Sequence, residues 1–168
     1  MRILAIESSA VTASVAILTD DVLTAEYTVN YKKTHSQTLL PMLDEISNMT
    51  ELDLSTIDAI AVAGGPGSFT GLRIGSATAK GLGLALEKPL ISIPTTAAIA
   101  YNIWDTDKFV CPIMDARRNQ VYTGVYCYTD HRLDTVWEQD TMSIEALAEG
   151  LNCLDHEVIF LGDGVAVY

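Results

Sequence analysis

A glycine-rich segment, GGPGSFTGLRIG at residues 64–75, is the feature of this sequence best suited to chemistry. A glycine turn that leads into a helix can bind phosphate through exposed N–H groups and the positive end of the helix dipole. The residues after Gly71 are not the Lys and Ser or Thr of a Walker A loop, and Thr70 replaces the third glycine of the dinucleotide fingerprint. A tight turn and a capped helix explain Gly65 and Gly67 at least as well as phosphate binding does.

Two acidic residues end corresponding strands in the two halves of the chain. Glu7 closes an apolar run near the N-terminus, and Asp115 closes its counterpart in the second half. Such acids hold a metal–nucleotide or act as a base when a fold places them across a cleft, although most strand-end acids are simply solvated. The other candidates for ligand binding are Ser8 and Arg117, which follow these acids in the sequence, and Gly162, which lies in a second glycine loop at residues 162–164.

The histidines and cysteines form no recognisable site. A helical metal pair that includes His35 would need a second ligand four residues later, where Leu39 stands. The three cysteines lack CxxC spacing, so we expect small buried thiols in a reducing compartment rather than disulfides or zinc ligands. We therefore predict no metal and no catalytic residue.

Small residues recur at every fourth position of the helix expected over residues 72–86. This stripe comprises Gly71, Gly75, Ala79 and Gly83. Glycine within a helix costs up to about 1 kcal/mol relative to alanine, so the stripe needs a reason. It permits another backbone to approach closer than the usual separation of roughly 8–10 Å between helix axes. The neighbour is either this chain or a second subunit, and we favour the second because the opposite face suits the sheet. That face contains Ile74, Ala77 and Leu84.

The elements that would position these residues form two similar halves. Each half begins with three strands joined by short connections, which favours an antiparallel meander, and continues with a helix, a strand and a glycine loop. The expected strands are 2–6, 13–18, 25–31, 58–63, 90–93, 109–114, 121–128, 133–137 and 158–161. The expected helices begin near Thr34, Leu72, Pro94 and Ser143. The pattern predicts an α/β protein with an internal duplication, in lobes 1–105 and 106–168, whose second copy is incomplete.

Composition bounds the class of protein. The chain has 168 residues, 49% of them apolar, and a formal net charge of −12. No run reaches the roughly 18 apolar residues of a membrane helix, and the apolar N-terminal run is too short for a signal peptide, so we expect a soluble, cytoplasmic protein. The negative charge disfavours direct binding of nucleic acid, because that affinity rests on Lys and Arg contacts to phosphate.

Six segments resemble, in the same order, those of the bacterial TsaB (YeaZ) family: ILAIESS, HSQTLLPML, AIAVAGGPGSFTGLRIGSATAKGL, PTTAAIA, DARRNQVY and LGDGVAVY. The resemblance implies an actin-like ATPase (ASKHA) fold of two RNase H-like lobes with mixed sheets. It implies a non-catalytic scaffold subunit of the complex that forms N6-threonylcarbamoyladenosine in tRNA, bound to the TsaD transferase subunit. A TsaE-like ATPase belongs to the same assembly, tRNA is reached only through the complex, and the isolated subunit forms a homodimer.

The resemblance also assigns residues. In this family the homodimer surface and the TsaD surface overlap on two helices, which correspond here to HSQTLLPML and GLRIGSATAKG. The implied subunit interface comprises His35, Leu39, Leu43, Gly71, Leu72, Gly75, Ala79 and Gly83. Departures from the catalytic relatives agree with a scaffold, since the HxxxH metal pair of TsaD-like proteins is absent. Glu7, Ser8 and Ser9 also replace the Asp-x-Gly-x-Thr phosphate loop of ATPases with this fold.

Two other functions remain open at this stage. The chain could be a nucleotide-binding hydrolase or a metalloprotease-like enzyme of the same fold, whose turnover would be lost on Glu7→Ala or Asp115→Ala. It could instead be a regulatory module that binds a nucleotide at an interface through Gly65, Gly67 and Gly162. The scaffold hypothesis depends on the small-residue stripe being a docking surface for a second polypeptide.

Overall fold

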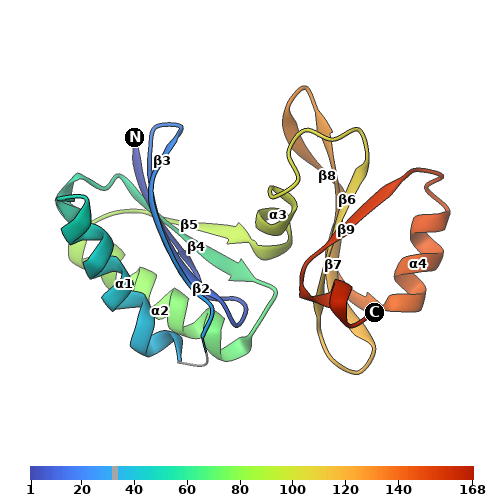
Figure 1. Ribbon diagram of the computed structural model, residues 1–168, viewed down its shortest axis with the longest axis horizontal. Helices are drawn as coiled ribbons and strands as arrows, with labels where there is room; N and C mark the ends of the chain where they lie inside the picture. The colour runs from blue at the N-terminus through green and yellow to red at the C-terminus, as the bar shows by residue number, and fades with distance from the viewer. Residues whose placement is uncertain (32–33) are drawn as a thin grey trace. The chain divides into compact units, whose positions relative to one another are not determined.

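The computed structural model describes residues 1–31 and 34–168 and divides into two compact units, Met1–Ile93 and Pro94–Tyr168 (Figure 1). The division precedes helix α3 (Thr95–Ala100), whereas the sequence analysis placed it after residue 105. Helix α3 packs on strands of the second unit, which explains the earlier division. In the described part of the chain, no helix combines the length and the hydropathy needed to cross a membrane.

The first unit is a five-stranded sheet in the order β3-β2-β1-β4-β5, with both of its long helices on one face (Figure 1). β1, β2 and β3 form an antiparallel meander, and β4 returns parallel to β1. The strands are β1 (Arg2–Glu7), β2 (Ala13–Thr19), β3 (Val22–Val29), β4 (Ala59–Gly65) and β5 (Leu90–Pro94). The helices are α1 (His35–Met49), the short 3-10 turn η1 (Leu54–Thr56) and α2 (Phe69–Leu86).

The core of the first unit lies between the sheet and these two helices. Alternate residues of β1 and β2 are buried there, as the period of two in a strand requires. Helix α1 buries a set with helical spacing, which confirms the periodicity seen in the sequence: Leu39, Met42, Leu43 and Ile46. Each such side chain contributes about 1.5–3 kcal/mol on burial.

The second unit repeats this arrangement with four strands in the order β8-β7-β6-β9. β6, β7 and β8 are antiparallel, and β9 runs parallel to β6. The elements are β6 (Phe109–Asp115), β7 (Gln120–Thr129), β8 (Arg132–Ser143), α4 (Ile144–Asn152), β9 (Val158–Leu161) and the 3-10 turn η2 (Asp163–Ala166). Cys111 and Leu147 belong to the core beneath α4, whereas Val110 and Tyr126 belong to the core beneath α3.

The α/β class and the repeated meander agree with the sequence analysis, but two strands differ in length. β3 begins at Val22, earlier than expected, because Asp20 and Asp21 close the hairpin directly and Thr19 pairs with Val22. β8 continues to Ser143, beyond the expected end at residue 137, because β7 pairs with it along its whole length. Tertiary pairing thus extends strands whose own residues are not strongly apolar.

Candidate functional site

The small-residue stripe of α2 faces the protein's own sheet. Gly71, Gly75, Ala79 and Gly83 are all buried. A Cβ at Gly71 would overlap the carbonyl oxygen of Ser8, and a Cβ at Gly75 would overlap its hydroxyl. The missing side chains therefore let α2 approach the end of β1, and the prediction that this stripe is a docking surface is wrong.

The opposite face of α2 is the outer one. Leu84 is 83% exposed and Ala77 is also exposed, although the sequence analysis expected both against the sheet. Ile74 packs only partly on the core. The reason is steric: where the helix lies closest to the strands, the smallest side chains fit, and larger apolar ones must point elsewhere.

The interface residues implied for α1 also serve the interior. Leu39 and Leu43 belong to the core, and Leu40 beside them is 53% exposed. The His35 ring is half-buried with its Nε2 2.8 Å from the carbonyl oxygen of Ala10, which gives this side chain a structural partner. The two segments named by the resemblance form the helices α1 and α2. Most of the residues that it assigned to an interface point inward, and other residues lie on the outer faces of these helices.

The glycine loop is packed against the turn after β1. The Ser68 amide donates to the carbonyl oxygen of Ser9 at 2.6 Å, and the Ser8 hydroxyl donates to the carbonyl oxygen of Gly71 at 3.0 Å. Ser8 is fully buried. Gly67 has a φ of +154° and leaves no room for a Cβ beside Ser9. Ser8 and Gly67 are therefore committed to internal packing rather than to a ligand.

The start of α2 is closed by its own cap. The Ser68 hydroxyl accepts a hydrogen bond from the Gly71 amide at 3.3 Å, as an N-cap residue does. Gly65, the last residue of β4, is buried with a φ of +101°, and a Cβ there would lie 3.2 Å from the Leu72 side chain. The capped tight turn, one of the two interpretations of the sequence, accounts for this geometry.

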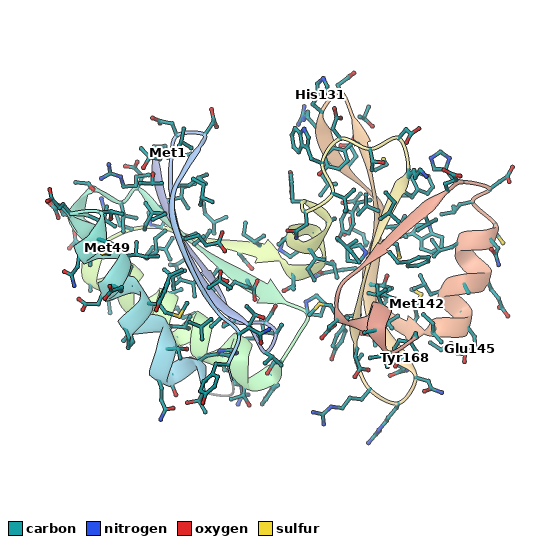
Figure 2. The ribbon with its side chains drawn as sticks, viewed as in Figure 1. Met1, Met49, His131, Met142, Glu145 and Tyr168 are labelled. Atoms are coloured by element: carbon teal, nitrogen blue, oxygen red, sulfur yellow. The ribbon has the colours of Figure 1, made fainter. Side chains whose placement is uncertain are left out.

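The two strand-end acids each have partners within their own unit. The Glu7 carboxylate accepts a hydrogen bond from the Ser9 amide. The Asp115 carboxylate accepts from the Arg117 amide at 2.8 Å and from the hydroxyl of Tyr168, labelled in Figure 2, at 3.2 Å. Arg117 thus engages Asp115 through its backbone at a hairpin turn.

Gly162 completes the group of candidates around Asp115. Its φ is +105°, and a Cβ there would overlap the carbonyl oxygen of Ile113 in β6. Desolvation, followed by the nearby Asp115 charge, raises the pKa of the Tyr168 phenol, so its hydroxyl stays a hydrogen-bond donor at neutral pH. The structure therefore gathers Asp115, Arg117 and Gly162 at the end of β6, in contacts that stabilise the turn.

The cysteines have different environments. Cys111 is buried, and desolvation raises the pKa of its thiol to about 11. The expectation of buried thiols is confirmed there and is wrong for Cys153, which is exposed at the end of α4. A buried thiol with this pKa is protonated at neutral pH and is a poor nucleophile.

Comparisons with known proteins identify the family. Residues 23–168 match the family model described as "TsaD: tRNA N6-adenosine threonylcarbamoyltransferase". Over its whole length the chain is 36% identical to the tRNA threonylcarbamoyladenosine biosynthesis protein TsaB of Bacillus subtilis (strain 168), of which it covers 73%. The chain belongs to the TsaB family. The TsaB of Escherichia coli (strain K12) is 33% identical over an alignment of 170 positions that covers 98% of this chain and 72% of that protein.

A solved TsaB-family structure supports the same fold. YeaZ from Pseudomonas aeruginosa matches with a TM-score of 0.77 at 30% identity, over 86% of this chain and 68% of that one. The α/β fold with mixed sheets that was predicted for the chain is thereby confirmed, and it is the fold of YeaZ. The family and its link to threonylcarbamoyladenosine biosynthesis are likewise those that the sequence predicted.

The TsaB helices present residues that sequence reasoning missed. Leu40 and Leu84 are exposed on α1 and α2, two helices that pack against each other. Phe69 is 68% exposed at the start of α2, and the Arg73 guanidinium lies 3.9 Å from its ring centroid. The sequence contained a signal for the exposure of Leu40, because this residue does not fit the helical spacing of the buried residues of α1.

Proposed function

We propose that this TsaB-family chain is a non-catalytic subunit that binds a TsaD-like transferase subunit through the outer faces of α1 and α2. The observation that carries the proposal is the pair of exposed leucines, Leu40 and Leu84, on two adjacent helices. An exposed leucine is common by itself, but two on neighbouring helices offer apolar area to a partner. We therefore assign the interface to this surface and not to the small-residue stripe, which is buried.

The surroundings of the glycine loop favour a scaffold over an enzyme. The segment that would approach a phosphate is bonded to the turn after β1, and Ser8 lies beneath it with its hydroxyl already engaged. A catalytic phosphate loop needs N–H groups and polar side chains directed at the ligand. Here Ser8 and the Ser68 amide are used to hold the loop in place.

The proposed assembly follows from the family. TsaB is named for threonylcarbamoyladenosine biosynthesis, and the proposed TsaD-like partner performs the transfer to tRNA. A TsaE-like ATPase joins the same complex in the cytoplasm, and the tRNA is contacted through the complex rather than by this acidic chain. Without the partner, the same outer faces of α1 and α2 bring two copies of the chain together.

Substitution of the outer leucines tests this proposal. Leu84→Asp and Leu40→Asp should each weaken binding of the TsaD-like subunit at least about tenfold in calorimetry, because a leucine that becomes buried contributes about 1.5–3 kcal/mol. Val22→Asp is the matched control, since Val22 is 65% exposed and lies on the β2–β3 hairpin rather than on either helix. Unchanged affinity in the folded leucine variants would show that these faces are not the interface.

A further inference from the structure

Two large aromatic side chains are exposed where helix α3 leads into strand β6. The turn after α3 continues the hydrogen bonding of the helix, since the amides of Tyr101, Asn102 and Ile103 donate to carbonyl oxygens three or four residues earlier. Tyr101 and Trp104 are three residues apart in this turn and therefore lie on the same side of it. Their exposed fractions are 55% and 63%, although aromatic residues of this size are mostly buried in proteins. The turn thus presents two rings to solvent.

A third ring, on strand β7, supports these two. Tyr128 meets the Trp104 ring edge-on, with 5.4 Å between the ring centroids and 65° between the ring planes. This geometry leaves at least one face of the Trp104 ring uncovered by Tyr128. Desolvation, followed by the nearby Tyr101 and Asp105 groups, raises the pKa of the Tyr128 phenol. Three aromatic residues and one carboxylate therefore form a single cluster, the aromatic patch of the second unit.

The carboxylate of the aromatic patch is held by a neighbouring hairpin. His131, labelled at the tip of the β7–β8 hairpin in Figure 2, places its Nδ1 atom 2.6 Å from Oδ2 of Asp105. Among residues 1–31 and 34–168, the other oxygen of Asp105, Oδ1, has no hydrogen-bond partner. Asp105 is thus oriented by one contact and keeps an oxygen available to a second donor.

The charge around the aromatic patch is negative. The second unit contains twelve Asp and Glu residues but four Lys and Arg residues. Arg132 of the same hairpin lies on the other face of the sheet, because its neighbour Leu133 packs with Tyr128 in the core beneath α3 and successive side chains of a strand alternate between faces. Lys108, at the start of β6, is paired with Glu157 at 2.7 Å. The field at the patch therefore favours a cationic ligand.

The groups of the aromatic patch select among cations. An ammonium group can lie over an aromatic face, but a guanidinium can stack on Trp104 and donate to Asp105 in the same pose, because it is planar and has five N–H donors. In the described part of the chain, the buried Tyr128 hydroxyl has no hydrogen-bond partner. An aliphatic side chain pressed on the patch would leave this hydroxyl unpaired, which is unfavourable. These features together favour an arginine.

We propose that the aromatic patch binds an arginine in a basic segment of a partner protein, with the guanidinium stacked on Trp104 and donating to Asp105. Tyr101 forms the side of the site, and the surrounding acids attract further Lys or Arg residues of the segment. The site belongs to the second unit and uses no residue of α1 or α2. It therefore stands or falls independently of the surface assigned to the TsaD-like subunit.

Selection from a displayed library of random heptapeptides, with the folded chain as bait and Trp104→Ala for counter-selection, tests the proposal. The enriched peptides should contain arginine. A synthetic peptide of the enriched sequence should bind at least about fivefold more weakly to Trp104→Ala and to Asp105→Asn. Phe160→Ala is the matched control and should bind normally. Phe160 is an exposed aromatic residue of β9 that pairs with Cys111, on the face of the sheet beneath α4.

Changes in the peptide give a second readout on the unaltered chain. Citrulline in place of the arginine keeps the planar group without its charge and should weaken binding at least about tenfold. Lysine should weaken it less, because the charge remains. Leu40→Asp, which tests the surface of the TsaD-like subunit, should leave peptide binding unchanged. Enrichment of peptides without arginine, or of none, would overturn the proposal. So would equal losses in Trp104→Ala and Phe160→Ala, or a loss of the chain's own dimer in Trp104→Ala with unchanged peptide affinity.

Discussion

The first four strands of each unit of this TsaB-family chain have the same order, but the glycine loops that follow the fourth strands differ. In the first unit the loop after β4 leads into the long helix α2, and Gly67 lies against the carbonyl of Ser9, just after β1. In the second unit the loop after β9 leads into the short turn η2, and Gly162 lies against the carbonyl of Ile113 in β6. Gly67 therefore packs on the turn that follows the first strand of its unit, and Gly162 packs on the first strand itself, so both glycines serve close packing.

The units also differ in charge. The first contains six Lys and Arg residues and ten Asp and Glu residues, whereas the second contains four and twelve. The net charges are thus −4 and −8, which makes the second unit the more acidic of the two. Two of the cations of the first unit, Arg73 and Lys80, lie on the same side of α2.

The largest effect is expected where α2 approaches β1. Gly71→Ala should destabilise the first unit by about 3 kcal/mol, because its Cβ would overlap backbone that cannot move aside easily. Gly81→Ala is the matched control in the same helix. Apart from adjacent residues and the backbone of the helix itself, no atom of the described residues lies within 4 Å of a Cβ there, so this change should stabilise the chain by up to about 1 kcal/mol. Urea unfolding measures both, and equal effects would contradict the close approach.

A smaller effect should be shared by the two glycine loops. Gly67→Ala and Gly162→Ala each place a side chain at positive φ and against a carbonyl oxygen, at a cost of about 2 kcal/mol. Thermal unfolding of the two variants should show similar losses, the first in the unit that contains β1 and the second in the unit that contains β6. If only one loop is sensitive, the common packing role is wrong.

The smallest effect is confined to the second unit and depends on pH. Because burial raises the pKa of Cys111 from 9.0 to about 11, folding favours the neutral thiol. This stabilisation is complete below pH 9 and is lost as the pH rises to 11. At pH 10 the loss is about 1 kcal/mol. The free energy of unfolding of Cys111→Ala should not show this loss between pH 9 and pH 11. If the variant and the parent chain have the same pH dependence of stability, the prediction is wrong.

Much of the fold could be predicted from the sequence. The apolar runs placed β1, β4 and β6, and the spacing of Leu39, Leu43 and Ile46 fixed the inner face of α1. The repeated order of elements predicted the duplication, since a meander followed by a parallel strand reproduces the same pairing in each unit. These features are local, and hydrophobic periodicity reports them directly.

The candidate site was predicted less well. The quoted motifs identified the TsaB family, and they identified α1 and α2 as the helices of interest. They did not identify the outer residues Leu40 and Leu84. Ser8, a candidate ligand residue, proved to be fully buried beneath α2. Motifs name the segments that matter but not the side of each segment that faces solvent.

The sequence by itself determined the family, through its motifs, and it determined the order of elements along the chain and the inner face of α1, through the regular spacing of apolar side chains. Only the tertiary structure decided the orientation of α2. Burial of apolar surface alone would favour an orientation with Ile74 and Leu84 against the sheet. The distance between α2 and the end of β1 is so short, however, that only glycine fits between them. That distance depends on where Ser8 lies in space, and this position follows from the packing of segments far apart in the chain.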